Sequence, residues 1–153
     1  MRLPISDPWS PVETRQRVEA PRDDVFNLLA DPRTYPDWLV GAQRIRDVDD
    51  EFPAEGTKFE HSVGPTEATT VDDNTEVIET HGHRQLMLEV HAGPFKGEVE
   101  FDLRKRGEAT EVVMREKPIG PAALLTPFIR PILALRNQRS MRQLAYIAQG
   151  RTA

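Results

Sequence analysis

The sequence predicts an α+β fold, in which a seven-stranded antiparallel sheet is combined with a long C-terminal helix and two short helices lie between the first and second strands. Three observations predict this class. Most segments between residues 12 and 117 alternate apolar with charged side chains, as strands with one solvated face do. Proline beside acidic residues marks two helix starts after the first strand. From Pro121 onward the apolar residues follow the helical period instead.

The first strand and the two short helices are predicted from local signals. Residues 12–19 alternate valine, threonine and glutamine with charged residues, which indicates a half-buried strand. A proline at a first helical position, followed by two aspartates in the first turn, predicts a short helix over residues 21–30. An aspartate–proline pair then predicts a second short helix from about Pro32 to Trp38.

The remaining six strands are expected to form an antiparallel meander. The alternation is clear over residues 57–63, 86–90 and 95–103. The segment 66–80 is interpreted as one strand with a β-bulge at Asp72–Asn74, because three such polar residues in a row are a turn signal.

The C-terminal helix is expected to begin properly at Thr126, to kink near Pro131 and to end with Gly150 just beyond its last turn. Its first half is apolar over an unusually wide arc of the helix surface. Such a surface must be shielded from water by a sheet, a ligand or a partner. One apolar stripe is formed by Leu124, Phe128, Ile132 and Leu135. Farther along the helix the stripe moves by about a quarter-turn or more, to Leu133, Asn137, Met141, Leu144 and Ala148.

Composition places these elements in one domain. The chain has 153 residues, of which 38% are hydrophobic and 29% charged. We expect an N-terminal arm over residues 1–11 and a single domain over residues 12–150. The longest apolar run has five residues, whereas a membrane span needs about twenty. With no apolar signal segment near the N-terminus and no cysteine, a cytoplasmic protein without a transmembrane segment is expected.

Charge is unevenly distributed along the chain. All 25 acidic residues precede residue 120, and residues 120–153 carry five arginines. We interpret this basic tail as a solvated helix face, or as a surface for an anionic partner. The absence of cysteine also excludes disulfides, thiolate metal sites and cysteine nucleophiles.

A family resemblance rests on the stretch VEAPRDDVFNLLADPRTYPDWLVG, and on Leu135-Arg136-Asn137 near the end of the chain. It resembles the opening of the START-like superfamily, also called SRPBCC or helix-grip proteins, and most of all its polyketide cyclase/dehydrase-type branch. The resemblance implies a curved sheet wrapped around the last helix, with an apolar cavity between them. It says little about function, because the superfamily includes lipid carriers, coenzyme Q-binding proteins and aromatase/cyclases.

Among the residues expected to face inward, three are small: Thr57, Ala92 and Gly97. Small side chains leave space unfilled, which is consistent with a cavity of about 300–1,000 Å³, the usual size of a ligand site. In a meander, three Gly-Pro steps at residues 64, 93 and 120 fall at one end of the sheet and would form the rim of an opening. The residues expected to bind ligand are Trp38, Phe59, His61, Val63, Leu88, Val90, Val99, Phe101, Val112, Met114, Phe128 and Ile132.

No motif for catalysis, metal or cofactor binding is found. His81 and His83 lie two apart in a charged turn, whereas zinc needs about three or four ligands. His61 is in phase with Phe59, so it faces the interior either as a hydrogen-bonded structural residue or as a ligand contact. Either Arg115 or Glu116 should also face inward. The sequence contains no GxSxG, phosphate loop or dinucleotide fingerprint, and we expect no catalytic residue, cofactor or nucleic acid.

Three functions are consistent with the sequence. The first is a carrier or sensor of a lipophilic small molecule such as a lipid, a quinone or a polyketide-like aromatic. The second is an aromatase/cyclase-like enzyme that uses the same cavity. The third is an interaction module whose basic, apolar C-terminal helix docks a second copy, a protein partner or an anionic surface.

Overall fold

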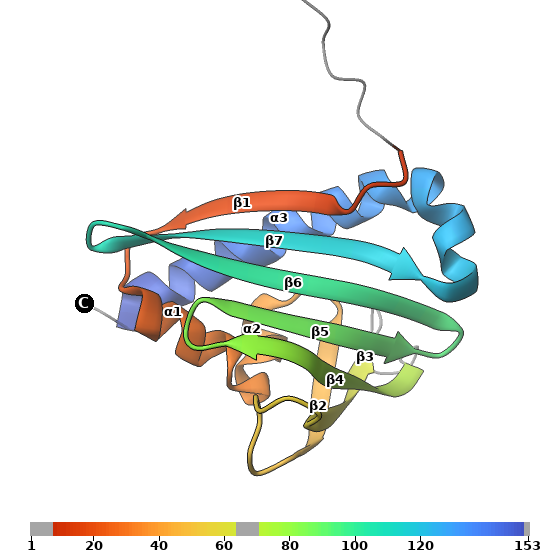
Figure 1. Ribbon diagram of the computed structural model, residues 1–153, viewed down its shortest axis with the longest axis horizontal. Coiled ribbons are helices and arrows are strands. Elements are labelled where there is room, and N and C mark those ends of the chain that lie inside the picture. Colours follow the sequence, from red (N-terminus) through yellow and green to blue (C-terminus); the bar gives the residue numbers. More distant parts are fainter. Residues whose placement is uncertain (1–7, 64–70, 152–153) are drawn as a thin grey trace, which may run out of the picture.

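The chain folds into one antiparallel sheet with all its helices on one side (Figure 1). The computed structural model describes residues 8–63 and 71–151. In chain order the elements are β1 (Val12–Val18), α1 (Arg22–Leu29), η1 (Pro32–Thr34), α2 (Tyr35–Trp38), β2 (Ala42–Val48), β3 (Lys58–Val63), β4 (Val71–His81), β5 (Gln85–Ala92), β6 (Phe95–Arg106), β7 (Ala109–Ile119), η3 (Gly120–Leu125) and α3 (Thr126–Arg151).

The seven strands run in the order β1-β7-β6-β5-β4-β3-β2, and every neighbouring pair is antiparallel. The first strand therefore pairs with the last, while β2 lies at the opposite edge. The two short helices span the distance between these edges, and α3 packs against β1 and β7 (Figure 1). The predicted fold class is confirmed, including the long last helix and the two helices between the first two strands.

Alternating burial explains why these segments form strands. In β6 the side chains at Val99, Phe101 and Leu103 are buried, while the residues between them are partly exposed and charged. Each strand thus turns one apolar face toward the helices and one charged face toward solvent, as the period of two predicts.

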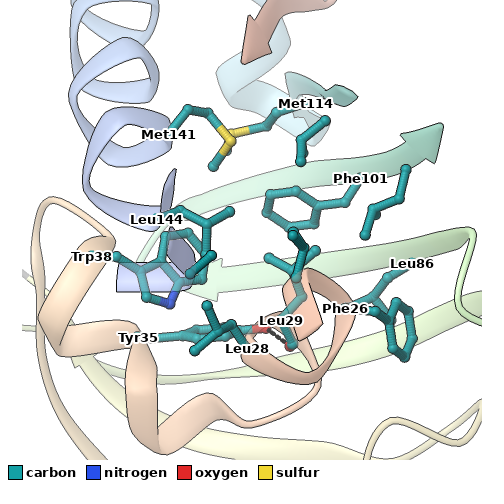
Figure 2. Close-up of a cluster of buried hydrophobic side chains, with 14 of the residues drawn as sticks. Phe26, Leu28, Leu29, Tyr35, Trp38, Leu86, Phe101, Met114, Met141 and Leu144 are labelled. Carbon is teal, nitrogen blue, oxygen red and sulfur yellow. Dashed lines mark hydrogen bonds between the residues drawn. The ribbon is translucent and has the colours of Figure 1, made fainter. Parts of the chain in front are cut away.

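A buried aromatic cluster fixes α2 against the sheet (Figure 2). The Tyr35 ring meets the rings of Trp38 and Phe59 edge to face, and Trp38 meets Phe101 in the same way. The Tyr35 hydroxyl donates a hydrogen bond to the Leu29 carbonyl at 2.5 Å, and the Trp38 Nε1–H donates to the Thr34 hydroxyl at 3.1 Å. Because both polar ends are hydrogen-bonded, these large rings are buried without leaving an unpaired polar group.

The predicted bulge in β4 is in the wrong place. Asp72–Asn74 pairs in unbroken register with β3, and the irregularity lies instead at Ile78, between Val77 and Glu79. Continuous pairing to β3 overrides the turn preference of three polar residues. The part of the predicted strand before Val71 lies outside the described residues.

The predicted end of the last helix is also wrong. α3 includes Gly150 and continues to Arg151, and Gly150 is not among the described glycines with positive φ, so it does not form a left-handed cap. Pro131 lies in the second helical turn and α3 continues through it as one element, although a proline there removes one backbone hydrogen bond.

Burial of Tyr35 has a consequence at high pH. The pKa of its phenol lies well above the ordinary value because burial disfavours the charged phenolate, and Asp31 adds to this effect. Tyr35 and Tyr146 are the two tyrosines of the chain, so in a Tyr146→Phe variant we expect no phenolate absorbance near pH 10, the usual tyrosine pKa, as long as the protein stays folded.

The free energy of unfolding keeps its full value below about pH 10, where the phenol is protonated in the unfolded chain as well. Above that pH the unfolded chain loses the proton while the folded protein retains it, so the free energy of unfolding falls. A combined ultraviolet and circular dichroism titration measures both events. Phenolate absorbance that rises before the circular dichroism signal changes would contradict the burial of Tyr35.

Candidate ligand cavity

A cavity of about 250 Å³ lies between the inner face of the sheet and the helices. Its volume is just below the usual range for small-molecule sites, about 300–1,000 Å³. The lining residues are Tyr35, Trp38, Leu39, Gly41, Ala42, Ile45, Phe59, His61, Thr75, Leu88, Val90, Ala92, Phe95, Gly97, Val99, Phe101, Met114, Glu116 and Arg136. Most of these are apolar, and Arg136 is the one lining residue that α3 contributes among those the structure describes.

Gly97 shows why the interior is not filled by side chains. It lies on β6 opposite Val90, and a Cβ atom placed on it would meet the Phe95 ring at 3.1 Å. The missing side chain thus leaves room for Phe95 to lie over the strand at the cavity wall. Thr57, in contrast, does not face the interior as predicted, because it lies in the turn before β3, where its hydroxyl donates to the Ala54 carbonyl at 2.6 Å.

The structure places eight of the twelve predicted ligand-binding residues around the cavity. These are Trp38, Phe59, His61, Leu88, Val90, Val99, Phe101 and Met114. Val112 is fully buried in the core but does not line the cavity. The backbone of Val63 ends β3, and its side chain lies outside the described residues.

The expectation that Phe128 and Ile132 face the cavity is wrong. Their side chains are 78% and 66% exposed on the outer side of α3. The buried face of this helix is the second predicted stripe, joined by Ser140 and Ala145: its residues are Leu133, Asn137, Ser140, Met141, Leu144, Ala145 and Ala148. Two polar residues belong to this face because they make buried hydrogen bonds, which a hydrophobicity pattern does not reveal.

Polar groups gather where α3 meets β7. Glu116 is 4% exposed, and its two carboxylate oxygens accept hydrogen bonds from Arg136 Nη1 at 3.3 and 3.4 Å. Asn137 Nδ2 donates to the same carboxylate at 3.5 Å, and Arg136 Nε donates to the Val40 carbonyl at 2.9 Å. Arg115 points to the other face, where it pairs with glutamates. The inward residue of the pair is therefore Glu116.

A second polar pair lines the wall formed by β3 and β4. His61 Nε2 lies 2.9 Å from the Thr75 hydroxyl, and both side chains are 3% exposed. The His61 ring also contacts the Phe59 ring at 5.5 Å between centroids. His61 is thus hydrogen-bonded within the core and is at the same time part of the cavity wall.

The cavity extends toward the end of the sheet that carries the Gly-Pro steps. Ala92 and Phe95 flank the turn at Gly93, and Glu116 lies near the end of β7, just before Gly120. Gly93 and Gly120 have φ values of 60° and 65°, which favour glycine. The predicted Gly-Pro step at residue 64 lies outside the described residues.

The other histidines have partners on the surface. His81 Nε2 pairs with Glu79 at 2.5 Å, and His83 pairs with Asp23 at 2.8 Å and stacks on Phe26. The hydrogen bond from His83 lowers the pKa of the Asp23 carboxyl. Within residues 8–63 and 71–151, no group of three or more potential metal ligands is found, and no helix has the length and hydropathy of a membrane span.

Sequence reasoning missed several lining residues. Tyr35 and Leu39 come from α2 and the loop after it, and Ile45 lies on β2 opposite His61 of β3. The alternation of β2 was a signal for Ile45, but it was too short and too polar to fix which face is buried. No pattern in the sequence places Arg136, a charged residue, at the wall of an apolar cavity.

The sheet order, the packed C-terminal helix and the cavity between them define a helix-grip α+β protein. The model of the polyketide cyclase / dehydrase and lipid transport family matches residues 18–144, and the chain belongs to this family. No curated protein matches the chain in sequence.

Solved structures share the fold at low sequence identity. CV1439 from Chromobacterium violaceum is 13% identical, with a TM-score of 0.75 over 92% of this chain and 97% of that one. TTHA0849 from Thermus thermophilus is 17% identical, with a TM-score of 0.73 over 94% and 99%. The Zhui aromatase/cyclase from Streptomyces sp. R1128 is 16% identical, with a TM-score of 0.71 over 94% and 95%.

The ion pair between Glu116 and Arg136 can be tested by single and paired substitution. Arg136→Met leaves a buried carboxylate without its cation and should destabilise the fold by about 3 kcal/mol, at the low end of values for buried pairs because Arg136 is partly exposed. Glu116→Gln combined with Arg136→Met removes both charges and should recover more than half of this loss. Urea unfolding followed by circular dichroism gives both values. A loss in the double variant equal to the sum of the losses in Arg136→Met and in Glu116→Gln alone would show that the two residues are not coupled.

Proposed function

We propose that this protein binds a lipophilic small molecule in the cavity between the sheet and α3. The observation that supports this most is the hollow itself: protein interiors are normally close-packed, and an apolar space of about 250 Å³ in a core costs stability. A ligand that occupies the space restores the missing packing contacts. The family to which the chain belongs combines lipid transport with polyketide chemistry, and both involve ligands of this kind.

Apolar contact alone gives modest affinity in a cavity of this size. If a ligand removes about 200 Å² of apolar surface from water, at about 25 cal/mol per Å², the gain is about 5 kcal/mol before the cost of association. Tighter binding needs polar contacts. Arg136, held by Glu116 and the Val40 carbonyl, supplies a fixed donor at one end of the cavity. We therefore expect the ligand to have an apolar body and a carbonyl or hydroxyl oxygen that reaches Arg136.

An aromatase/cyclase-like activity is the second candidate. The observation that favours it is the pair of polar clusters in one apolar cavity, His61 with Thr75 and Glu116 with Arg136. Ring closure of a polyketone requires removal of a proton next to a carbonyl and stabilisation of the resulting enolate. His61 is suited to the proton transfer, and Arg136 to the enolate oxygen.

Filling the cavity should abolish ligand binding. Met114→Trp introduces a large side chain from the floor of the cavity, and we expect an environment-sensitive apolar dye to bind at least about tenfold more weakly, a loss of ~1.4 kcal/mol. Met87→Trp is the matched control, because Met87 lies on β5 between two inward residues and does not line the cavity. Val90→Phe is a milder second filling variant, and circular dichroism reports whether each variant is folded. Unchanged dye binding in both filling variants would contradict the proposed site.

A cyclisation assay distinguishes the two candidates. The protein is incubated with a poly-β-ketone substrate, and the ring products are compared with those of the spontaneous reaction. If the protein is an enzyme of this type, His61→Ala should lower the rate of cyclisation by about a hundredfold or more, the usual contribution of a general base, while dye binding changes less than tenfold. Ring formation no faster than the spontaneous reaction would leave binding as the function.

A further inference from the structure

The outward face of α3 carries an apolar surface that no described element covers. Its side chains are between 53% and 78% exposed, and they come from η3 and the first half of the helix: Leu124, Leu125, Phe128, Ile132 and Leu135. Single exposed apolar residues are common, but five large ones on one face mark an interaction surface. We refer to these five residues as the outer apolar patch.

The same helix face becomes cationic beyond the patch. From Leu125 to Leu135 the exposed residues follow a spacing of three and four, and this spacing continues to Arg139, Arg142 and Tyr146. Residues at this spacing share one side of a helix. Both arginines are exposed, and neither forms an ion pair within the described residues. The face is therefore apolar along its first half and basic along its second.

We propose that this face docks on an anionic lipid bilayer. The outer apolar patch would enter the boundary between headgroups and acyl chains, and Arg139 and Arg142 would meet lipid phosphates. An amphipathic helix with apolar residues and arginines is suited to such an interface. Residues 120–153 carry five arginines and no acidic residue, and two of these arginines, Arg139 and Arg142, lie on this face. The remainder of the chain is acidic, so a negative surface attracts this side of the molecule more than the others.

A second copy of the chain fits the face less well. In a parallel pairing of two α3 helices, Arg139 and Arg142 would meet the same arginines of the other copy. In an antiparallel pairing they would lie against Phe128 and Ile132. Neither arrangement offers a carboxylate, because no acidic residue occurs after Glu116. Anionic lipid satisfies both halves of the face, whereas neither pairing of two copies satisfies the basic half.

Docking would also place the cavity beside the bilayer. Arg136 lines the cavity from the same turns of α3 that carry Ile132 and Leu135 on the outside. Ser10, just before β1, lies beside the first turns of α3, where Arg130 donates a hydrogen bond to its carbonyl, and Trp9 is 53% exposed. The docking surface rests on exposure and charge alone, and it does not depend on the proposed ligand.

Vesicle flotation tests the proposal with the full chain. We expect binding to mixed phosphatidylcholine–phosphatidylglycerol vesicles that weakens with added salt, and at least about tenfold weaker binding to phosphatidylcholine alone. Phe128→Asp combined with Ile132→Asp should weaken binding by at least about tenfold. Arg139→Gln and Arg142→Gln should each weaken it about fivefold. These side chains are exposed, so the variants should keep the fold, which circular dichroism checks.

Matched controls separate this face from the rest of the surface. Ile78→Asp changes an exposed apolar residue on the sheet, and Arg17→Gln changes an exposed arginine on β1; both should bind vesicles as the wild type does. Since the chain has no cysteine, Ile132→Cys and Arg17→Cys each give a single labelling site. When anionic vesicles are added, the emission of an environment-sensitive dye attached at position 132 should shift to shorter wavelength, and the emission of the same dye at position 17 should not.

Three results would overturn the proposal: no binding to anionic vesicles, equal loss of binding in the controls, or a dimer in analytical ultracentrifugation that Phe128→Asp dissociates. The last result would assign the face to a second copy of the chain.

Discussion

The position of α2 is the constraint on which the cavity depends. Tyr35 and Trp38 lie between the sheet and α3, and their rings pack on Phe59 and Phe101. Trp38 and Leu144 of α3 belong to the same buried cluster, which closes the core on this side of the cavity (Figure 2). Because the aromatic rings cannot be compressed, they hold the helix layer away from part of the sheet, and the space left beside them is the cavity.

Hydrogen bonds to the loop after α2 keep α3 in place above that space. The backbone of Val40 donates to the Ser140 hydroxyl at 3.0 Å and accepts from Arg136 Nε at 2.9 Å. Arg136 therefore has two roles. It links α3 to this loop by a hydrogen bond, and it lines the end of the cavity beside Glu116. Such a buried ion pair is weak evidence for added stability, since desolvation offsets its attraction. Its place at the end of an apolar cavity fits a role in orienting a ligand better.

The sequence was sufficient for the fold and for part of the cavity. Strand alternation identifies Phe59, Val99 and Phe101 as inward residues, because one face of an antiparallel sheet must be apolar. For α3 the sequence predicts two stripes, and one of them is the buried face. The prediction failed for Phe128 and Ile132 on the other stripe, which were expected at the cavity and are exposed. The more apolar face lies outside, and the face with Asn137 and Ser140 lies inside, since hydrogen bonds across the interface compensate for burial. Such pairings depend on tertiary contacts that no local pattern encodes. The bulge in β4 and the role of Arg136 escaped prediction for the same reason.

The central claim is that the interior is hollow in order to hold a small apolar molecule. Native mass spectrometry of the protein purified gently from its own host tests it most directly. The account predicts a species heavier than the 17.4 kDa chain that releases a small apolar molecule on collisional activation, and no such species for the Met114→Trp variant. A wild-type protein that carries no small molecule, and takes up none from a lipid extract of that host, would contradict it.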